Sequence, residues 1–312
     1  MPVRRLLYNA AFAVLLASPT LALAAACPVP HSTFGSSGTA NGEFNRPFGI
    51  SADPGGLLYV TDQQNERVQV FDANGNFVRT WPVPVDPVRG YAYPTGICVS
   101  NGIVWVSANQ GHYVGRWTTS GTFLGYVTNP FGGWYYPTDI AADADGQIYI
   151  ANSNYGQIVR VDPVSLNVVT LWNTNGTPYG LHVDALGTVC VGDIGNHVVS
   201  RWTRDGVWLA QLSTPLPFFA PEGIASDGAG NLYVCDTGNR RVQKFAMNGS
   251  WLCTFGFEGS GLGELFVPSD LCVAPNGDLY VVEYGNNRVQ RFTFGAVASK
   301  PASWGRLKTL YR

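Results

Sequence analysis

The sequence lacks several features that would place it in a common functional class. After one apolar run near its start, no second apolar segment of about 20 residues follows, which argues against a retained membrane helix. Its body is also short of positive charge. Six of the 19 Lys and Arg lie outside residues 27–299, which leaves 13 there against 21 Asp and Glu, a net charge of −8. An acidic body offers no electrostatic surface for nucleic acid.

Motifs for several kinds of chemistry are also missing. No phosphate-binding loop and no nucleophile elbow is present. No stretch has a sustained helical period. The cysteines lack the CxxC pairs typical of zinc and redox sites; they are Cys27, Cys98, Cys190, Cys235, Cys253 and Cys272.

The first 26 residues have the order of a secretory signal peptide. Two arginines precede a mostly apolar run from Leu6 to Leu23, and small residues follow up to Cys27. We therefore expect an exported protein, secreted, periplasmic or on the cell surface, with residues 1–26 removed. Export permits disulfides. An alternative is a lipidated N-terminus at Cys27, although Ala24 stands where a lipoprotein signal usually has Leu.

The remaining chain contains six copies of one pattern. They begin at PFGI (47–50), PTGI (94–97), PTDI (137–140), PYGL (178–181), PEGI (221–224) and PSDL (268–271). Each continues into LYV-like residues, a turn that often reads Asp-x-x-Asn, and a run such as RVQVF (67–71). A last run follows a hairpin signal such as Asn74-Gly75. Four short strands in about 43 residues predict one propeller blade, so we expect an all-β, six-bladed β-propeller over residues 27–295, with four antiparallel strands per blade.

These copies resemble the NHL-repeat family. Its pattern combines P-x-G-[IL]-x-V-D, G-x-[IL]-Y-V-x-D and N-x-R-[VI]-Q-x-F, which the first and fifth copies meet almost whole and the others in part. The match covers about residues 33–295. The resemblance implies a propeller that binds through one face, where the loops between the second and third strands and between successive blades lie. We expect a monomer.

The sequence also predicts how the ring closes. TFGSSGTANGEFNRP (33–47) aligns without gaps to TFGFEGSGLGELFVP (254–268), which is the end of a fourth strand and the loop that follows it. The sixth copy has no such strand after Phe294. We therefore expect residues 31–34 to complete the sixth blade, which removes an open sheet edge. Residues 296–312 are expected to form a basic tail outside the blades.

Two cysteines share one repeat position. Cys98 and Cys272 stand where other copies have Ser51, Ala141 and Ala225. Small side chains at one strand position indicate a packed interior, so we expect both to be buried thiols.

Metal-dependent enzymes with this kind of fold provide the catalytic alternative. Zinc-dependent amidating lyases place His at inner-strand positions of several blades, and this chain has none there. We expect His182 in the core, and His112 and His197 in equivalent turns two blades apart. Zinc needs three or four converging ligands, so the sequence argues against a zinc site.

Calcium-dependent lactonases, also six-bladed propellers, gather Glu, Asn and Asp around the channel. Glu222, Asn152 and Asp193 could supply such oxygens. However, Asn152 and Asp193 share one repeat position with Asp62, Asp236 and Glu283, which favours turn capping. We therefore expect no cofactor, with Ca²⁺ as the alternative.

Aromatic residues give the stronger signal. Those that recur at one repeat position, such as Tyr59 and Tyr233, are expected to pack between blades. Others break the repeat and fall on the loop face: Tyr93 and Tyr136 before Pro, Tyr113 and Tyr155 in or beside turns, and Phe48 and Tyr179 at the channel mouth. The residues after Pro are expected to surround that mouth; they are Phe48, Thr95, Thr138, Tyr179, Glu222 and Ser269.

Clustered exposed aromatics with polar neighbours mark interaction sites, and flat rings suit sugar faces or extended peptides. The alternative for some of them is loop packing, because loops 82–92 and 129–136 are longer than the repeat needs. The sequence therefore predicts a non-catalytic binding scaffold for a protein or glycan, with ligand contacts at Phe48, Tyr93, Tyr113, Tyr136, Tyr155, Tyr179 and Glu222. The alternative is a lactonase-like or lyase-like enzyme that uses a divalent ion at the channel.

Overall fold

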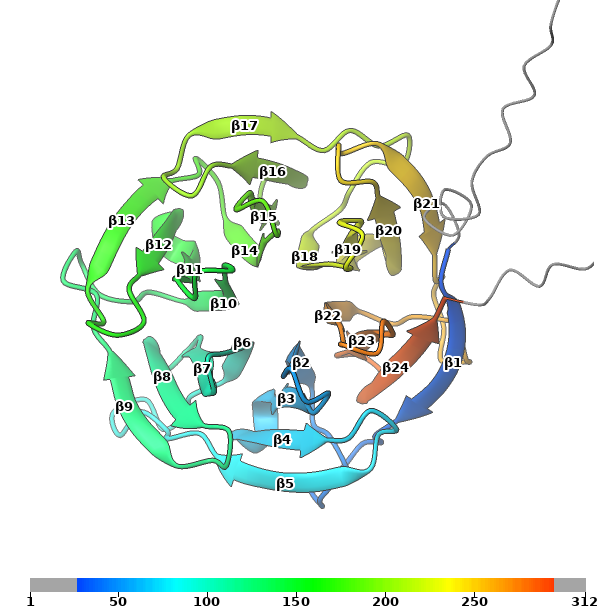
Figure 1. The fold of residues 1–312 in the computed structure, drawn as a ribbon. Helices are drawn as coiled ribbons and strands as arrows, with labels where there is room; N and C mark the ends of the chain where they lie inside the picture. The colour runs from blue at the N-terminus through cyan, green and yellow to red at the C-terminus, as the bar shows by residue number, and fades with distance from the viewer. Residues whose placement is uncertain (1–26, 295–312) are drawn as a thin grey trace, which may run out of the picture.

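The computed structural model describes residues 27–294, which form six four-stranded sheets around a central axis (Figure 1). Each sheet is antiparallel and runs from an innermost strand near the axis to an outermost strand at the rim. The predicted all-β, six-bladed propeller is confirmed. No helix in the described residues is long and apolar enough to cross a membrane. The expected basic tail, residues 296–312, lies outside the described residues.

The strands of the first three blades follow chain order from the axis outward. Blade 1 contains β2 (Pro47–Ala52), β3 (Leu58–Asp62), β4 (Arg67–Phe71) and β5 (Phe77–Pro82). Blade 2 contains β6 (Pro94–Ser100), β7 (Ile103–Ala108), β8 (Tyr113–Thr118) and β9 (Phe123–Val127). Blade 3 contains β10 (Pro137–Ala142), β11 (Ile148–Asn152), β12 (Gln157–Val161) and β13 (Val168–Asn173).

The second half of the ring repeats this order. Blade 4 contains β14 (Pro178–Val183), β15 (Val189–Asp193), β16 (Val198–Trp202) and β17 (Trp208–Gln211). Blade 5 contains β18 (Pro221–Ser226), β19 (Leu232–Asp236), β20 (Arg241–Phe245) and β21 (Trp251–Phe255). Blade 6 contains β22 (Pro268–Val273), β23 (Leu279–Glu283), β24 (Arg288–Thr293) and, outermost, β1 (Val29–Phe34).

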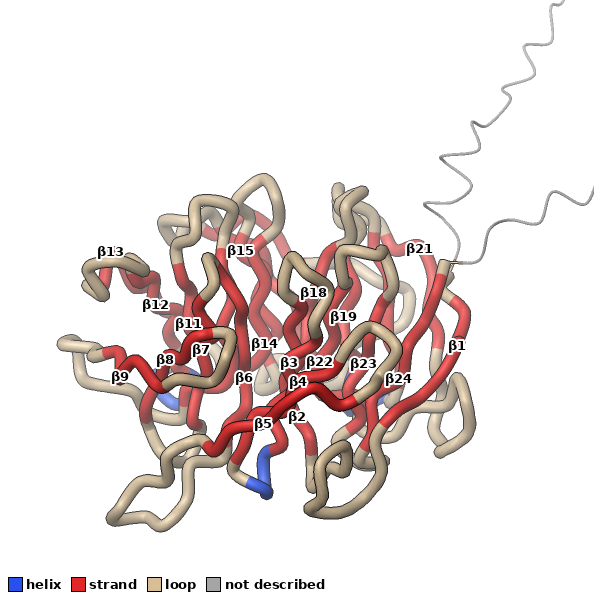
Figure 2. Tube along the Cα trace, turned by 60° about the horizontal axis from the view of Figure 1, so that its bottom comes forward, coloured by secondary structure: helices blue, strands red, loops and turns tan. Residues whose placement is uncertain are grey.

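One end of the strands carries the turns that the sequence singled out. Single-turn 3-10 helices follow the second strand in three blades: η1 (Gln63–Asn65), η2 (Ser153–Tyr155) and η3 (Thr237–Asn239). Figure 2 shows these turns at one end of the ring, together with loops between blades. At the opposite end, the hairpin before β5 depends on Gly75, whose φ of +85° favours glycine.

The N-terminal strand closes the ring as predicted. β1 pairs with β24 along its length, with Thr33 opposite Gln290 and Phe34 opposite Val289. The two strands come from opposite ends of the described chain and lie side by side at the rim (Figure 1). Blade 6 thereby gains its fourth strand and presents no unpaired edge of β24.

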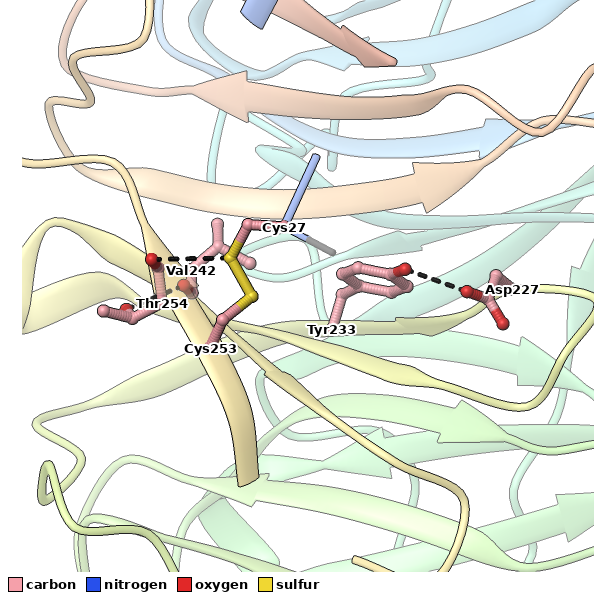
Figure 3. Close-up of a disulfide and its surroundings, with 6 residues drawn as sticks. All are labelled: Cys27, Asp227, Tyr233, Val242, Cys253 and Thr254. Atoms are coloured by element: carbon pink, nitrogen blue, oxygen red, sulfur yellow. Dashed lines mark hydrogen bonds between the residues drawn. A yellow bond between two sulfur atoms is a disulfide. The ribbon is translucent and has the colours of Figure 1, made fainter. Parts of the chain in front are cut away.

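A disulfide reinforces this closure. Cys27, just before β1, is bonded to Cys253 in β21 of the neighbouring blade, 226 residues away (Figure 3). A sulfur in this bond is not available for a thioether to lipid, so the bond is incompatible with the lipidated alternative. Cys98 and Cys272 are buried free thiols, as predicted, because both point into packed interiors.

Recurring tyrosines fill the space between neighbouring blades. Tyr233 is fully buried, and its hydroxyl donates to Asp227 Oδ2 at 2.8 Å (Figure 3). This bond satisfies a hydroxyl that burial would otherwise leave unpaired. Three further tyrosines hold the same position and are equally buried, so the set belongs to the framework: Tyr59, Tyr149 and Tyr280.

Blades 1, 5 and 6 each contain a hydrogen-bond network at the loop face, formed by a buried acid, an arginine and a glutamine. In blade 5 the Asp236 carboxylate accepts hydrogen bonds from Arg241 Nε at 2.7 Å and from Gln243 Nε2 at 2.9 Å. The same arginine and glutamine donate to the carbonyl of Leu216 in the loop that leads into the blade. The network therefore fixes that loop over the third strand. Its counterparts are Asp62, Arg67 and Gln69 in blade 1 and Glu283, Arg288 and Gln290 in blade 6.

Candidate functional site

A cavity of about 400 Å³ lies at the channel mouth on the loop face. Phe48 and Tyr179 enter it from the innermost strands of blades 1 and 4, and Tyr284 enters from the turn after β23. The Phe48 ring lies edge-on to both, with centroids 5.9 Å from Tyr179 and 6.1 Å from Tyr284. The three rings therefore form one continuous aromatic wall.

Polar groups complete the rim of this cavity. Arg46 lies over the Tyr284 ring, 5.3 Å from its centroid, and donates to the Tyr284 hydroxyl at 3.0 Å. Amide side chains and Tyr93 line the side next to blades 1 and 2; the amides are Gln63, Gln64, Asn109 and Gln110. An aromatic wall with amides at its rim can hold a ligand that has both a flat apolar face and hydrogen-bonding groups.

Glu222 is the one acidic residue in the lining of this cavity. Its Oε2 is buried and has no hydrogen-bond partner. Burial raises the pKa of the Glu222 carboxyl to about 8, because water no longer stabilises its charge. At neutral pH the group is therefore mostly protonated, and its O–H can donate to a ligand oxygen.

Two aspartates narrow the channel beneath the mouth. Asp139 and Asp270 stand where the other four blades have glycine, and each caps the innermost strand of the next blade. Asp139 Oδ2 accepts from the Leu181 N–H at 2.7 Å, and Asp270 Oδ2 from the Ile50 N–H at 2.8 Å. Burial raises the pKa of Asp139 to about 7. Burial, followed by the charge of Asp139, also raises the pKa of Asp270.

Four of the seven predicted ligand contacts line the mouth cavity: Phe48, Tyr93, Tyr179 and Glu222. The other three occupy framework contacts. Tyr113 donates its hydroxyl to the carbonyl of Pro84, and Tyr155 donates to the carbonyl of Gly132 at 3.2 Å. Tyr136 packs edge-on against His112 with ring centroids 4.8 Å apart. These three side chains hold the long loops onto blades 2 and 3.

The expected ring of six residues around the mouth is wrong at Thr95, Thr138 and Ser269, none of which lines the mouth cavity. Both threonines are 1% exposed, and each hydroxyl lies 3.4 Å from the carbonyl oxygen of the proline that begins the next blade, Pro137 or Pro178. Thr95 Oγ1 lies 3.0 Å from Ser107 Oγ, and Thr138 Oγ1 lies 2.6 Å from Ser153 Oγ. Ser269 is equally buried and donates to the carbonyl of Phe48 at 2.8 Å.

Two histidines connect neighbouring blades. His112 Nδ1 accepts the N–H of Tyr136 at 3.3 Å, and His197 Nδ1 accepts the N–H of Ala220 at 3.1 Å. Both have positive φ, and Asn287 makes the same bond from the same repeat position. The imidazoles therefore act as interblade hydrogen-bond acceptors.

His182 lies at the opposite opening of the channel, in a cavity of about 190 Å³. Its Nε2 is 2.8 Å from Ser226 Oγ, and burial lowers its pKa to about 4. The ring makes the single hydrogen bond expected for it, but it is only partly buried and lines this cavity instead of the packed core.

The residues proposed for calcium do not fit such a site. Asn152 and Asp193 direct oxygen atoms to backbone N–H groups, among them that of Tyr135 at 2.8 Å and that of Thr177 at 3.0 Å. Within residues 27–294, no group of three or more His, Cys, Asp or Glu is arranged to hold a metal ion. Asn152 and Asp193 instead cap turns.

Sequence reasoning missed Tyr284, Arg46, Asp139 and Asp270. Tyr284 could have been found, because other copies have a non-aromatic residue at its repeat position. The two aspartates also replace a glycine in their copies. Arg46 carries no such signal, since its role depends on the ring beneath it.

Comparisons with known proteins agree with this architecture. A model of the NHL repeat matches residues 44–71, 220–245 and 267–292. NHL repeat-containing protein 3 is 28% identical in mouse and 26% identical in human over 179 residues. These residues are 49% of this chain and 51% of each relative, so the chain spans about half the length of those proteins.

Solved structures are similar in fold. A streptogramin B lyase structure has a TM-score of 0.61 at 14% identity and covers 84% of this chain and 96% of the lyase. An auxiliary nutrient binding protein from Bacteroides thetaiotaomicron has a TM-score of 0.64 at 13% identity, with 80% and 69% covered.

The three matched repeats are blades 1, 5 and 6, the blades with the acid, arginine and glutamine network. The other three blades keep the four strands and lose parts of that network. With the matched repeats and the six-bladed ring, this chain is an NHL-repeat β-propeller.

Proposed function

We propose that this propeller is an exported, non-catalytic scaffold that binds a protein or glycan at the channel mouth. The mouth cavity carries the proposal, because it combines three aromatic rings with a buried carboxyl that has an unpartnered oxygen. Buried polar atoms without partners are rare, so one that belongs to a residue in the cavity lining favours a ligand that completes it.

The chemistry of the wall favours an uncharged polar ligand. Rings at these separations offer flat faces to a sugar or to an extended peptide. With a pKa of about 8, the Glu222 carboxyl donates a hydrogen bond at neutral pH to a hydroxyl or carbonyl oxygen. Ligand capture should therefore be present at pH 6 to 7 and decline as the pH rises through 8.

Export is supported by the signal-like N-terminus and by the Cys27–Cys253 disulfide, because disulfides persist in oxidising compartments. N-terminal sequencing of protein recovered from the producing cell tests this part. A mature chain that begins at Cys27 supports export, and an intact Met1 with reduced cysteines would contradict it.

Binding is tested with panels of glycans and of peptides displayed at pH 6.5 and pH 9. We expect capture of at least one class at pH 6.5, reduced at pH 9 and by Tyr179→Ala. Tyr155→Ala is the matched control, because that ring lies on the same face outside the cavity. Capture that is unchanged at pH 9 and unchanged in Tyr179→Ala would contradict the proposal.

A metal-dependent lactonase or lyase is the second candidate, and the likeness to the streptogramin B lyase fold is what favours it. That likeness concerns the fold alone, and the calcium set does not converge here. Stoichiometric calcium or zinc in the purified protein would favour the enzyme.

A further inference from the structure

Blade 4 keeps the buried acid of the framework network and lacks the arginine and glutamine that accompany it elsewhere. In blades 1, 5 and 6 the acid lies opposite an arginine in the next strand. Asp193 of blade 4 lies opposite Val198, and Ser200 stands at the glutamine position. Blades 2 and 3 have no acid at this position, so blade 4 alone combines the acid with the missing arginine.

Asp193 consequently has no cationic partner in the part of the chain that the structure describes. It is 4% exposed, and its Oδ2 accepts one hydrogen bond, from Asn196 Nδ2 at 2.8 Å. The corresponding oxygen of Asp236 accepts three, from Asn239, Arg241 and Gln243. None of the ion pairs found within residues 27–294 includes Asp193. Asp193 Oδ1 accepts the backbone N–H groups of Thr177, Gly195 and Asn196, so what this carboxylate lacks is the positive charge of the arginine.

The loop that would cover this part of the blade is also short. The connection into blade 4, residues 174–177, has four residues. The connections into blades 1, 5 and 6 are residues 35–46, 212–220 and 256–267, and their carbonyls accept from the network arginines. A cavity of about 370 Å³ therefore remains beside Asp193; its walls include Asn196, Val198, Ser200, Trp202 and Trp208.

We propose that this cavity binds a guanidinium group, the side chain of an arginine in an extended segment. The planar fork of N–H donors matches a carboxylate and supplies the missing positive charge. Trp208 is 57% exposed, and Trp202 is held by a hydrogen bond from its Nε1 to Ser200 Oγ at 2.8 Å. Indole faces attract a guanidinium and its aliphatic stem. The site is separate from the mouth cavity and does not depend on its function.

The direct test titrates the full chain with N-acetyl-arginine methylamide and with the citrulline and lysine counterparts, followed by NMR. Citrulline has the shape of arginine without its charge. We expect the arginine probe to shift Trp202 and Trp208 signals and to bind at least about tenfold more tightly than citrulline. Lysine, a point charge without the planar fork, should fall between them.

Three variants assign the site. Val198→Arg places an internal guanidinium opposite Asp193, as in blades 1, 5 and 6, so probe binding should be lost and the melting temperature should rise. Gln157→Arg puts the same arginine opposite Asn152 in blade 3 and should leave binding unchanged. Asp193→Asn should abolish binding in a folded protein, since blade 3 already carries asparagine at this position.

A double substitution in the tail, Arg306→Gln with Arg312→Gln, distinguishes an arginine of this chain from an arginine of a partner. Tighter probe binding by this variant than by the wild type shows that the site's natural occupant is the chain itself. Equal binding shows that the arginine comes from a partner. Equal affinity for arginine and citrulline, undiminished binding by Asp193→Asn, or no binding by either the wild type or the tail variant overturns the proposed site.

Discussion

Arg241 lies directly across the sheet from Asp236 and donates its Nε–H to that buried carboxylate at 2.7 Å. The arginine also reaches the carbonyls of Leu216 and Pro217. One side chain therefore joins two strands of blade 5 to the loop that precedes it, and the same arrangement recurs in blades 1 and 6.

Removal of this arginine should destabilise the protein strongly. Arg241→Met leaves the Asp236 carboxylate, fully buried, without its counter-ion, and such a change typically costs about 3–5 kcal/mol. Arg89→Met is the control, because its ion pair with Asp86 lies at the surface, where water screens the charges, so its loss should change stability little. Chemical denaturation of both variants measures the difference. Similar losses in the two would mean that the buried network does not hold the blade.

The interblade disulfide should stabilise the closed ring. Loss of a cross-link over a long loop typically costs about 2–5 kcal/mol, so Cys253→Ser should lower the melting temperature of the oxidised protein. Addition of reductant should lower the wild type to the same value and leave Cys253→Ser unchanged. A reductant effect that persists in the variant would assign the stabilisation to other cysteines.

Substitution of a framework tyrosine should destabilise the protein more than substitution of a tyrosine at the channel mouth. Tyr233→Ala removes a fully buried ring and should cost about 3–5 kcal/mol. Tyr93→Ala and Tyr179→Ala should cost clearly less, because these side chains are only partly buried at the loop face. Melting curves of the three variants decide this. Equal destabilisation would show that the loop-face rings are framework residues as well.

Stability should fall as the pH rises towards 8, in part because of Glu222. Its folded pKa of about 8 lies above the usual value of 4.5. Between these values the folded state retains a proton that the unfolded state has lost, so each rise in pH weakens folding. Glu222→Gln removes this contribution and should show a smaller loss between pH 5 and 8. If Glu222→Gln loses as much stability between pH 5 and 8 as the wild type, the pH dependence comes from Asp139 and Asp270 instead.

Repetition made the fold readable from the sequence. Six Pro-x-[GD] starts and the gapless match between residues 33–47 and 254–268 predicted both the blade number and the closing strand. The Cys27–Cys253 bond was not predictable in this way, because neither residue recurs in the repeats. It depends on β1 and β21 lying in neighbouring blades.

The site was predictable only in part. Breaks in the repeat located Phe48, Tyr93, Tyr179 and Glu222, which share one cavity. The same rule selected Tyr113, which lies opposite Ala108 and fills the place that Arg67 occupies in blade 1. A break in a repeat can thus compensate for another missing side chain as readily as mark a ligand site. Only the packing around each ring distinguishes the two.

The central claim is that the channel mouth holds the ligand. The dissociation constant of a captured glycan or peptide, measured at pH 6.5 for the wild type, Tyr179→Ala, Glu222→Ala and Tyr155→Ala, tests it most directly. If these groups anchor the ligand, Tyr179→Ala and Glu222→Ala should each weaken affinity at least about tenfold. Tyr155→Ala should stay within about twofold of the wild type. Equal affinities for all four folded proteins would contradict the claim and move the binding surface away from the channel.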